Sequence, residues 1–325
     1  FKGDGIGPEI TDAVLAILDA AGADLDYEIF RVGAAEYEEN GALIPEEGFA
    51  SFEKTHVLLK SPITTPLGTG FRSLNVTLRK KYDLYANMRP AKSNAAVKTP
   101  FEHVDIVMFR ENTEDLYAGV EEKIDENTAH SIKIITRKCS ERIVRSAFDY
   151  AVKNKRKKVT CVHKANIMKL SDGLFRDVFY EISREYPGIE AEDKIVDNVA
   201  MQLVMHPETF DVIVTENLYG DILSDLTSGL IGGLGLLPSS NMGTDFAMFE
   251  AVHGSAPDIA GKGIANPTAF LWSACMMLEH LGKQEISAKI RRAVDEVLKD
   301  GTILTPDLGG CAGTEAYTKA IIERL

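Results

Sequence analysis

The stretch Phe210-Asp-Val-Ile-Val-Thr-Glu-Asn-Leu-Tyr-Gly-Asp-Ile-Leu-Ser-Asp225 decides the fold class, because a buried strand over 210–215 leads into a helix. Asp221 and Asp225 lie one turn apart on that helix, so their carboxylates face the same way and repel each other by about 0.2–0.5 kcal/mol. Two hard carboxylates with room for water and substrate oxygens suit Mg²⁺ or Mn²⁺. A solvated acidic face is the alternative, and the pair alone favours it. The apolar stretch that follows over 226–233 argues against a fully exposed helix.

Strand-like and helix-like segments alternate along the chain, which indicates an α/β protein. Pro8 opens a helix whose apolar stripe ends before Gly22, and another helix is expected to begin near Ser73. Polar residues such as Arg110 and Lys164 directly follow predicted strands, and open α/β sheets bind ligands at the carboxyl ends of their strands. The further strands are expected at 56–60, 104–109, 159–163 and 247–252.

Length and composition limit the function classes. The 325 residues are enough for a large core and two domains. The formal net charge of −13 argues against nucleic-acid binding through the general field of the protein, so an anionic small molecule would need a local cluster of arginines. No apolar run reaches the roughly 18 residues of a membrane span and no signal peptide is recognisable, so no membrane partner is expected. The four cysteines are too far apart for a zinc or redox motif, which favours free thiols in a reducing compartment.

Three arginines form a candidate site for a small molecule with several negative charges. In Ser73-Leu-Asn-Val-Thr-Leu-Arg79, a helix that starts near Ser73 places Asn75 and Arg79 on one face and two leucines on the opposite, buried face. Arg89 and Arg110 lie at the ends of further elements. Each arginine alone is more often a surface residue. Because arginine is the preferred residue for bidentate carboxylate binding, the three together indicate a polyanionic substrate.

Other positions carry candidate chemistry. Tyr117 is either a proton donor or a half-buried aromatic residue, and Lys164 is a candidate base because burial or a nearby cation lowers the pKa of a lysine. Asp197 is either a helix N-cap or a third metal carboxylate. The glycine-bracketed loop His253-Gly-Ser-Ala-Pro-Asp-Ile-Ala-Gly261 can approach a nucleotide closely. Gly3-Asp-Gly-Ile-Gly7 lacks the Gly-x-Gly-x-x-Gly spacing of the dinucleotide fingerprint, so any nicotinamide cofactor is bound by another architecture.

Taken together, these motifs resemble those of the β-decarboxylating dehydrogenases, the family of isocitrate and 3-isopropylmalate dehydrogenases, from Gly3-Asp-Gly-Ile-Gly-Pro-Glu9 to the C-terminal segment. The resemblance implies an α/β fold that is not a Rossmann fold, with a mixed sheet through a large domain (1–84 plus 232–325) and an inserted small domain (85–231). A projecting hairpin predicted over 119–136 falls within the clasp, at about 117–137, through which two subunits of the family join. We therefore expect a homodimer with shared active sites, or a higher oligomer.

The resemblance also narrows the substrate. Ser73-x-Asn75-x-x-x-Arg79 is similar to the isocitrate-binding pattern, with Ser73 and Asn75 directed to the γ-carboxylate, whereas the matching stretch of isopropylmalate enzymes is more apolar. A site built around polar groups can strongly reject an apolar analogue, which favours isocitrate. By the same resemblance, the substrate carboxylates are bound by Arg79, Arg89 and Arg110.

The family chemistry implies a role for each remaining candidate. Asp221 and Asp225 of one subunit, with the partner subunit's Asp197, would hold Mg²⁺ or Mn²⁺, which acts as Lewis acid and template. Lys164, contributed from the second subunit, would help to remove the hydroxyl proton of the substrate. Hydride leaves C2 for the nicotinamide, CO₂ is lost, and Tyr117 protonates the enol at C3.

The cofactor implied by the resemblance is NAD. Asp258 is similar to the NAD-type residue of the family, because a carboxylate accepts hydrogen bonds from a free ribose 2′-hydroxyl and repels a 2′-phosphate. Asn266 would contact the adenine, and Asn166 would help to place the nicotinamide and the substrate. The other expected cofactor-binding residues are Thr65, His253, Gly254 and Ile259.

Three alternatives remain open. The first is a related enzyme that acts on 3-isopropylmalate, homoisocitrate or tartrate. The second is a non-catalytic regulatory subunit of a heteromeric isocitrate dehydrogenase, although such a subunit would be expected to have lost some of the catalytic and metal residues. The third is control of the enzyme by phosphorylation at Ser73, where a phosphate would repel the substrate. We expect a cytoplasmic location in a prokaryote and the mitochondrial matrix in a eukaryote.

Overall fold

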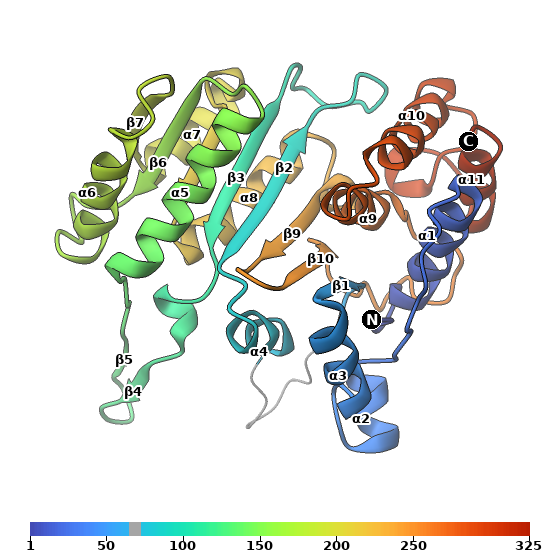
Figure 1. Ribbon diagram of the computed structural model, residues 1–325, viewed down its shortest axis with the longest axis horizontal. Helices are drawn as coiled ribbons and strands as arrows, with labels where there is room; N and C mark the ends of the chain where they lie inside the picture. The colour runs from blue at the N-terminus through green and yellow to red at the C-terminus, as the bar shows by residue number, and fades with distance from the viewer. Residues whose placement is uncertain (65–72) are drawn as a thin grey trace.

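The computed structural model describes residues 1–64 and 73–325, and its centre is a mixed sheet with helices on both faces (Figure 1). The strands span Val57–Lys60 (β1), Ala86–Lys92 (β2), Asp105–Glu111 (β3), Glu121–Lys123 (β4), Ala129–Ser131 (β5), Lys158–His163 (β6), Glu190–Ile195 (β7), Val212–Thr215 (β8), Pro238–Met242 (β9) and Ala247–Ala251 (β10). The eight-stranded sheet has the order β1-β10-β9-β2-β3-β8-β6-β7, and β4 pairs with β5 in a separate hairpin.

The two helices predicted at Pro8 and near Ser73 are confirmed. Pro8 lies in the first turn of the first helix, and Gly22 ends it in the left-handed conformation at φ 79°. Ser73 is the N-cap of the helix that carries Asn75 and Arg79. The α-helices span Gly7–Ala21 (α1), Ala34–Asn40 (α2), Glu46–Thr55 (α3), Leu74–Lys81 (α4), Arg137–Lys153 (α5), Ser171–Ser183 (α6), Val196–Met205 (α7), Asn217–Leu230 (α8), Thr268–His280 (α9), Gln284–Asp300 (α10) and Thr314–Ile322 (α11).

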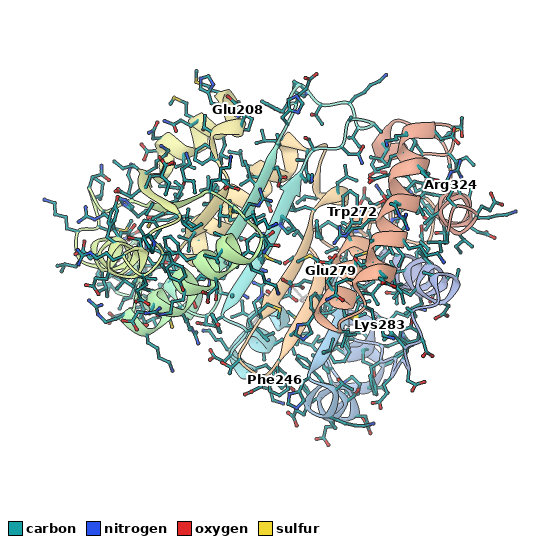
Figure 2. The ribbon with its side chains drawn as sticks, turned by 45° about the horizontal axis from the view of Figure 1, so that its top comes forward. Glu208, Phe246, Trp272, Glu279, Lys283 and Arg324 are labelled. Atoms are coloured by element: carbon teal, nitrogen blue, oxygen red, sulfur yellow. The ribbon has the colours of Figure 1, made fainter. Side chains whose placement is uncertain are left out.

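Helices cover both faces of the half of the sheet that contains β8. Val212 and Val214 of β8 belong to one core with α5 and α6, while Ile213 belongs to a second core with α7 and α8. Successive side chains of a strand point to opposite faces, so a strand buried on both faces is a continuous apolar run. A further core joins α1, α9, α10 and α11, and Trp272 of α9 packs against both this core and that of α7 and α8 (Figure 2). In the described residues no helix has the length and apolar character of a membrane span.

The strands do not all run in the same direction. β1, β10 and β2 run one way, and β9, β3, β8, β6 and β7 run the other. The carboxyl ends of β1 and β3 therefore point in opposite directions. The predicted gathering of polar residues at strand ends holds for the parallel strands β3 and β8, since Arg110 at the end of β3 contacts Asp221, which follows β8. It does not extend to β1 and β10, because these two strands run opposite to β3.

Cross-strand register, instead, places charged side chains in one row. Lys60 of β1 pairs with Glu250 of β10, and Glu250 pairs with Ser239 of β9. On the next strand Met88 pairs with Ser240, so Arg89 is the following residue of β2. This row forms one wall of the candidate site.

The predicted hairpin over 119–136 is confirmed as a structural feature. β4 and β5 are antiparallel, and every residue of both strands is exposed. The hairpin extends away from the central sheet (Figure 1). A two-stranded hairpin is marginally stable alone in water.

Candidate active site

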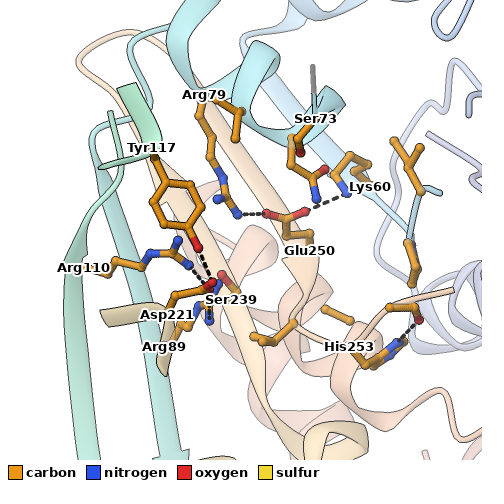
Figure 3. A pocket seen from close by; sticks show the side chains of 17 residues that line it. Lys60, Ser73, Arg79, Arg89, Arg110, Tyr117, Asp221, Ser239, Glu250 and His253 are labelled. Carbon is orange, nitrogen blue, oxygen red and sulfur yellow. Dashed lines mark hydrogen bonds and ion pairs between the residues drawn. The ribbon is translucent and has the colours of Figure 1, made fainter. Parts of the chain in front are cut away.

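A cavity of about 240 Å³ opens over the row of charged residues (Figure 3). It brings together side chains from α4, α8 and five adjacent strands of the sheet, β1, β10, β9, β2 and β3. Four cationic side chains face two carboxylates there, so the cavity has an excess of positive charge that favours an anionic ligand. The charged lining residues are Lys60, Arg79, Arg89, Arg110, Asp221 and Glu250.

Glu250 is the buried counter-ion of two of these cations. Its carboxylate lies 2.7 Å from Lys60 Nζ and 3.1 Å from Arg79 Nη2. Burial alone would raise the pKa of Glu250, but Lys60 and Arg79 outweigh burial and lower it to about 2. Glu250 therefore stays ionised and holds both cations at the wall of the cavity.

Arg110 and Arg89 extend from the sheet toward α8, the helix that carries Asp221 and Asp225. Arg110 donates to Asn217 Oδ1 through Nε at 2.9 Å and Nη2 at 2.7 Å, and its Nη1 contacts Asp221. Arg89 donates to Ser224 Oγ at 2.5 Å. Burial and the neighbouring guanidinium groups lower the pKa of Arg89 and of Arg110, so an anion bound among them would relieve their repulsion.

Gly220 allows Arg110 to take this position. A Cβ atom at residue 220 would lie 2.5 Å from Cγ of Arg110. The arginine therefore crosses α8 where the helix has no side chain.

Several buried polar atoms of the cavity wall have no partner within the described part of the chain. They are Arg79 Nε, Arg89 Nε and Asn75 Oδ1. Buried polar groups in folded proteins are nearly always hydrogen-bonded, so these atoms indicate where a polar ligand belongs. Ser73 and Asn75 both line the cavity, in agreement with the helix-face prediction.

Asp221 and Asp225 lie on one face of α8, as predicted. Burial raises the pKa of Asp225. Burial would also raise the pKa of Asp221, but Arg110, the hydrogen bond from Tyr117 and the neighbouring arginines together lower it. Both side chains remain partly exposed, 40% for Asp221 and 58% for Asp225, which leaves coordination positions open to water and substrate. The pair thus fits a hard divalent cation. In residues 1–64 and 73–325 no group of three potential metal-ligating side chains converges within one chain.

Tyr117 lines the same cavity and donates a hydrogen bond from its hydroxyl to Asp221 (Figure 3). Its ring also lies over Arg110, 5.0 Å from the guanidinium carbon. Burial and the contact with Asp221 raise the pKa of Tyr117, so the phenol keeps its proton at neutral pH. This geometry suits a proton donor.

Lys164, Asn166 and Asp197 do not line this cavity in the single chain. Lys164 Nζ pairs with Asp197, and both Asn166 and Asp197 are exposed. Ile195 is the N-cap of α7 and Asp197 lies in the first turn, so the prediction of Asp197 as the N-cap is wrong. The hydrogen bond from Lys164 explains the lowered pKa of Asp197.

A second cavity, of about 570 Å³, adjoins the first, and His253 and Gly254 line both. Ile259 and Asn266 also line the second cavity, as expected for a cofactor site, whereas Asp258 is exposed beside it and is not part of its wall. Asn266 donates to Asp307 Oδ2 at 2.8 Å. The expected cofactor residue Thr65 lies outside the described residues.

Sequence reasoning missed four polar side chains of these cavities: Lys60, Glu250, Ser239 and Asp307. Glu250 carried a recognisable signal, because it is a charged residue within the apolar strand Ala247-Met-Phe-Glu-Ala251. The other three depend on which strands and loops become neighbours, and spacing along one chain does not reveal that.

The fold and the two cavities define an α/β protein with a site for a small polyanion beside two metal-competent carboxylates. The model of the isocitrate/isopropylmalate dehydrogenase family matches residues 1–325, and the chain belongs to this family.

The similarity to individual relatives is also high. A probable mitochondrial isocitrate dehydrogenase (NAD) subunit alpha of Drosophila melanogaster is 48% identical over 100% of this chain and 86% of its own length. An isocitrate dehydrogenase (NADP) of Thermus thermophilus is 50% identical over 100% of this chain and 67% of its own length. The crystal structure of isocitrate dehydrogenase from Methylococcus capsulatus matches with a TM-score of 0.96 at 52% identity, covering 99% of this chain and 97% of that one.

Proposed function

We propose that this chain catalyses the oxidative decarboxylation of isocitrate to 2-oxoglutarate and CO₂ with reduction of NAD. The observation that carries the proposal is the excess of positive charge in the first cavity, next to the carboxylates of Asp221 and Asp225. Isocitrate supplies three carboxylates and a hydroxyl group, which complement the arginines and the unpaired polar atoms. The names of the relatives support the same substrate.

The arginines bind and orient the substrate. Arg79, Arg89 and Arg110 would each take a carboxylate, since guanidinium groups match carboxylates in two parallel hydrogen bonds. Ser73 and Asn75 reach the same cavity from α4 and would contact the γ-carboxylate. The unpartnered Nε atoms of Arg79 and Arg89 are donors that this ligand would satisfy.

The remaining residues would hold the metal ion and transfer the protons. Asp221 and Asp225, completed by the partner subunit's Asp197, would hold Mg²⁺ or Mn²⁺, which would supply Lewis-acid stabilisation of negative charge on the substrate. The partner subunit's Lys164 would accept the hydroxyl proton. Tyr117, with its raised pKa, would donate a proton to C3 after CO₂ has left.

The second cavity would bind NAD, which accepts hydride from C2. His253 and Gly254 line both cavities and would lie where the nicotinamide meets the substrate. Asn266 and Ile259 would contact the adenosine half, and the exposed carboxylate of Asp258 would repel a 2′-phosphate. Thr65 and Asn166 are the remaining cofactor contacts of the proposal.

The proposed active site needs two subunits. Asp197 and Lys164 lie outside the cavity of their own chain, so a homodimer with shared sites would bring them to the partner's cavity. Exposed apolar side chains on α7 and α8 and the uncovered hairpin β4–β5 support such an interface. The core formed by α1, α9, α10 and α11 shares no residue with the core formed by α5 and α6, which supports a large domain (1–84 plus 232–325) and a small domain (85–231). The compartment would follow the source organism, as the mitochondrial name of one relative illustrates.

The alternatives differ in measurable ways. A 3-isopropylmalate enzyme would need an apolar surface where Ser73 and Asn75 lie, and a regulatory subunit would not need Tyr117, Lys164 and the aspartates together. Because one relative is named as a subunit alpha, the alternative of a regulatory subunit is also tested below. For control at Ser73, which is exposed at the cavity, Ser73→Asp should raise the KM for isocitrate, and an unchanged KM would rule out the electrostatic premise.

One spectrophotometric assay tests the proposal. The purified chain is mixed with Mn²⁺, and absorbance at 340 nm is followed with isocitrate, 3-isopropylmalate, homoisocitrate or tartrate, each with NAD and with NADP. The highest kcat/KM is expected for isocitrate with NAD. No turnover of any substrate by the chain alone would revive the regulatory alternative, and preference for NADP would overturn the role of Asp258.

A further inference from the structure

Three buried asparagines lie directly behind the candidate active site. Asn87 of β2 and Asn241 of β9 are cross-strand partners, and Asn112 follows β3. Asn87 and Asn241 have no exposed surface, and Asn112 is 3% exposed. None of the three lines either cavity, so the mechanism proposed above does not use them.

The hydrogen bonds fix the orientation of the central amide. Asn241 Oδ1 accepts from Asn87 Nδ2 at 3.0 Å and from Asn112 Nδ2 at 2.9 Å. Asn241 Nδ2 donates to Glu250 Oε1 at 2.9 Å. The opposite amide orientation would turn a carbonyl oxygen toward a carboxylate and an NH₂ group toward two donors, so the chemistry of the neighbours permits only one orientation.

Glu250 transmits this arrangement to the cavity. Its Oε1 atom accepts from both Asn241 and Arg79, while its Oε2 atom pairs with Lys60. The same network also reaches the other arginines, because Asn87 lies two residues before Arg89 and Asn112 two residues after Arg110. Each strand that carries an arginine thus donates one amide to Asn241.

We propose that Asn241 is a positioning residue for the reaction proposed above. Its amide N–H holds Glu250 in the orientation that directs Arg79 and Lys60 at the substrate, and its carbonyl ties β2 and β3 to the same point. Because the arginines act in substrate binding, loss of the hydrogen bonds made by the Asn241 amide should weaken the binding of isocitrate more than it slows the chemical step.

Asn241→Asp is the sharpest test. The aspartate has the same size and keeps the oxygen that accepts from Asn87 and Asn112, but an oxygen atom replaces the NH₂ group that donates to Glu250. When ionised, the new carboxyl repels Glu250; when protonated, it can donate as the amide does. Asn241 Nδ2 donates to Glu250 of β10, and Glu250 in turn pairs with Lys60 of β1 and Arg79 of α4, so these are the charged groups next to the new carboxyl. At pH 8 we expect the KM for isocitrate to rise about tenfold, the scale of a lost hydrogen bond to a charged group, with kcat changed less than threefold.

The pH dependence of KM distinguishes a positioning role of Asn241 from a general loss of structure in the variant. The ratio of variant to wild-type KM should fall as the pH is lowered from 8 to 6, because protonation restores the donor. Ser240→Ala is the matched control: Ser240 is buried on the same strand, and its hydroxyl has no partner within the described residues, so its KM should stay at the wild-type value. Asn87→Ser removes one of the two donors to Asn241 Oδ1, together with the hydrogen bonds from Asn87 Nδ2 to Ser239 Oγ and the Ser240 carbonyl. This second variant should raise KM about threefold.

A folded Asn241→Asp enzyme with KM within twofold of wild type at pH 8 would overturn the inference, and so would a KM ratio that does not change with pH. If Asn241→Asp does not fold, an unchanged KM in Asn87→Ser overturns it. A wild-type chain without isocitrate activity would refute the proposed function instead. In that case calorimetric binding of tricarballylate, a plain tricarboxylate, replaces KM, and equal affinity of wild type and Asn241→Asp would overturn the inference.

Discussion

The buried ion pair between Lys60 and Glu250 gives the most quantitative prediction, through the substitution Glu250→Gln. The substitution keeps the shape of the side chain but removes the charge that compensates Lys60, whose side chain is 1% exposed. Removing one partner of a buried pair leaves the other charge uncompensated in the interior, which typically costs about 3–5 kcal/mol.

The lowered pKa of Glu250 gives a second value for the free energy by which its charge stabilises the folded protein, and the two values are similar in size. One pKa unit corresponds to about 1.4 kcal/mol, so the lowering from 4.5 to about 2 corresponds to about 3 kcal/mol of stabilisation from ionised Glu250. Since the pKa is lower in the folded state, this stabilisation is fully present above pH 4.5 and is lost as the pH falls toward 2. The difference between wild type and Glu250→Gln should therefore be constant near neutral pH and shrink in acid.

Urea unfolding at a fixed protein concentration measures the effect, with fluorescence of the single tryptophan, Trp272 on α9, as the signal (Figure 2). Glu28→Gln is the matched control, because Glu28 also lies 2.7 Å from a lysine, Lys54, but that pair is exposed at the surface. Glu28→Gln should leave the urea midpoint unchanged. A shift for Glu250→Gln no larger than that of the control would refute the reasoning that burial gives the pair its strength.

Three further variants test the site. Tyr117→Phe should lower kcat by about 10²–10⁴ with little change in KM, as expected for loss of a general acid, and a normal kcat in steady-state assays would exclude that role. Gly220→Ala should raise the KM for isocitrate and cost about 1–3 kcal/mol of stability, because its Cβ would lie 2.5 Å from Arg110 Cγ. Gly229→Ala on the same helix is its control, since nothing lies within 4 Å of that Cβ, and equal effects of the two would contradict the assignment. Asp258→Lys should raise the kcat/KM ratio of NADP to NAD at least tenfold, and an unchanged ratio would remove Asp258 from cofactor selection.

Local patterns in the sequence were sufficient to predict three helices, α1, α4 and α8, and the faces of α4 and α8 that carry the polar candidates. The spacing of Ser73, Asn75 and Arg79 correctly predicted one polar face on α4, and the i, i+4 spacing correctly placed Asp221 and Asp225 on one face of α8. These are short-range consequences of helix geometry.

Long-range pairing could not be predicted in the same way. The pairing of β10 with β1 on one side and with β9 on the other determines that Lys60, Glu250 and Ser239 form one row, and no local pattern reports it. Lys164 and Asp197 pair with each other outside the cavity. Under the proposed function they would serve a neighbouring subunit, and no local pattern in the sequence would report such a role.

The most direct test of the central claim is the anomalous scattering of Mn²⁺ in crystals grown with isocitrate. The proposed function predicts one manganese peak beside the carboxylates of Asp221 and Asp225, with isocitrate bound between the metal and Arg79, Arg89 and Arg110. Isocitrate bound in that cavity without a manganese peak, or a peak far from both aspartates, would contradict it.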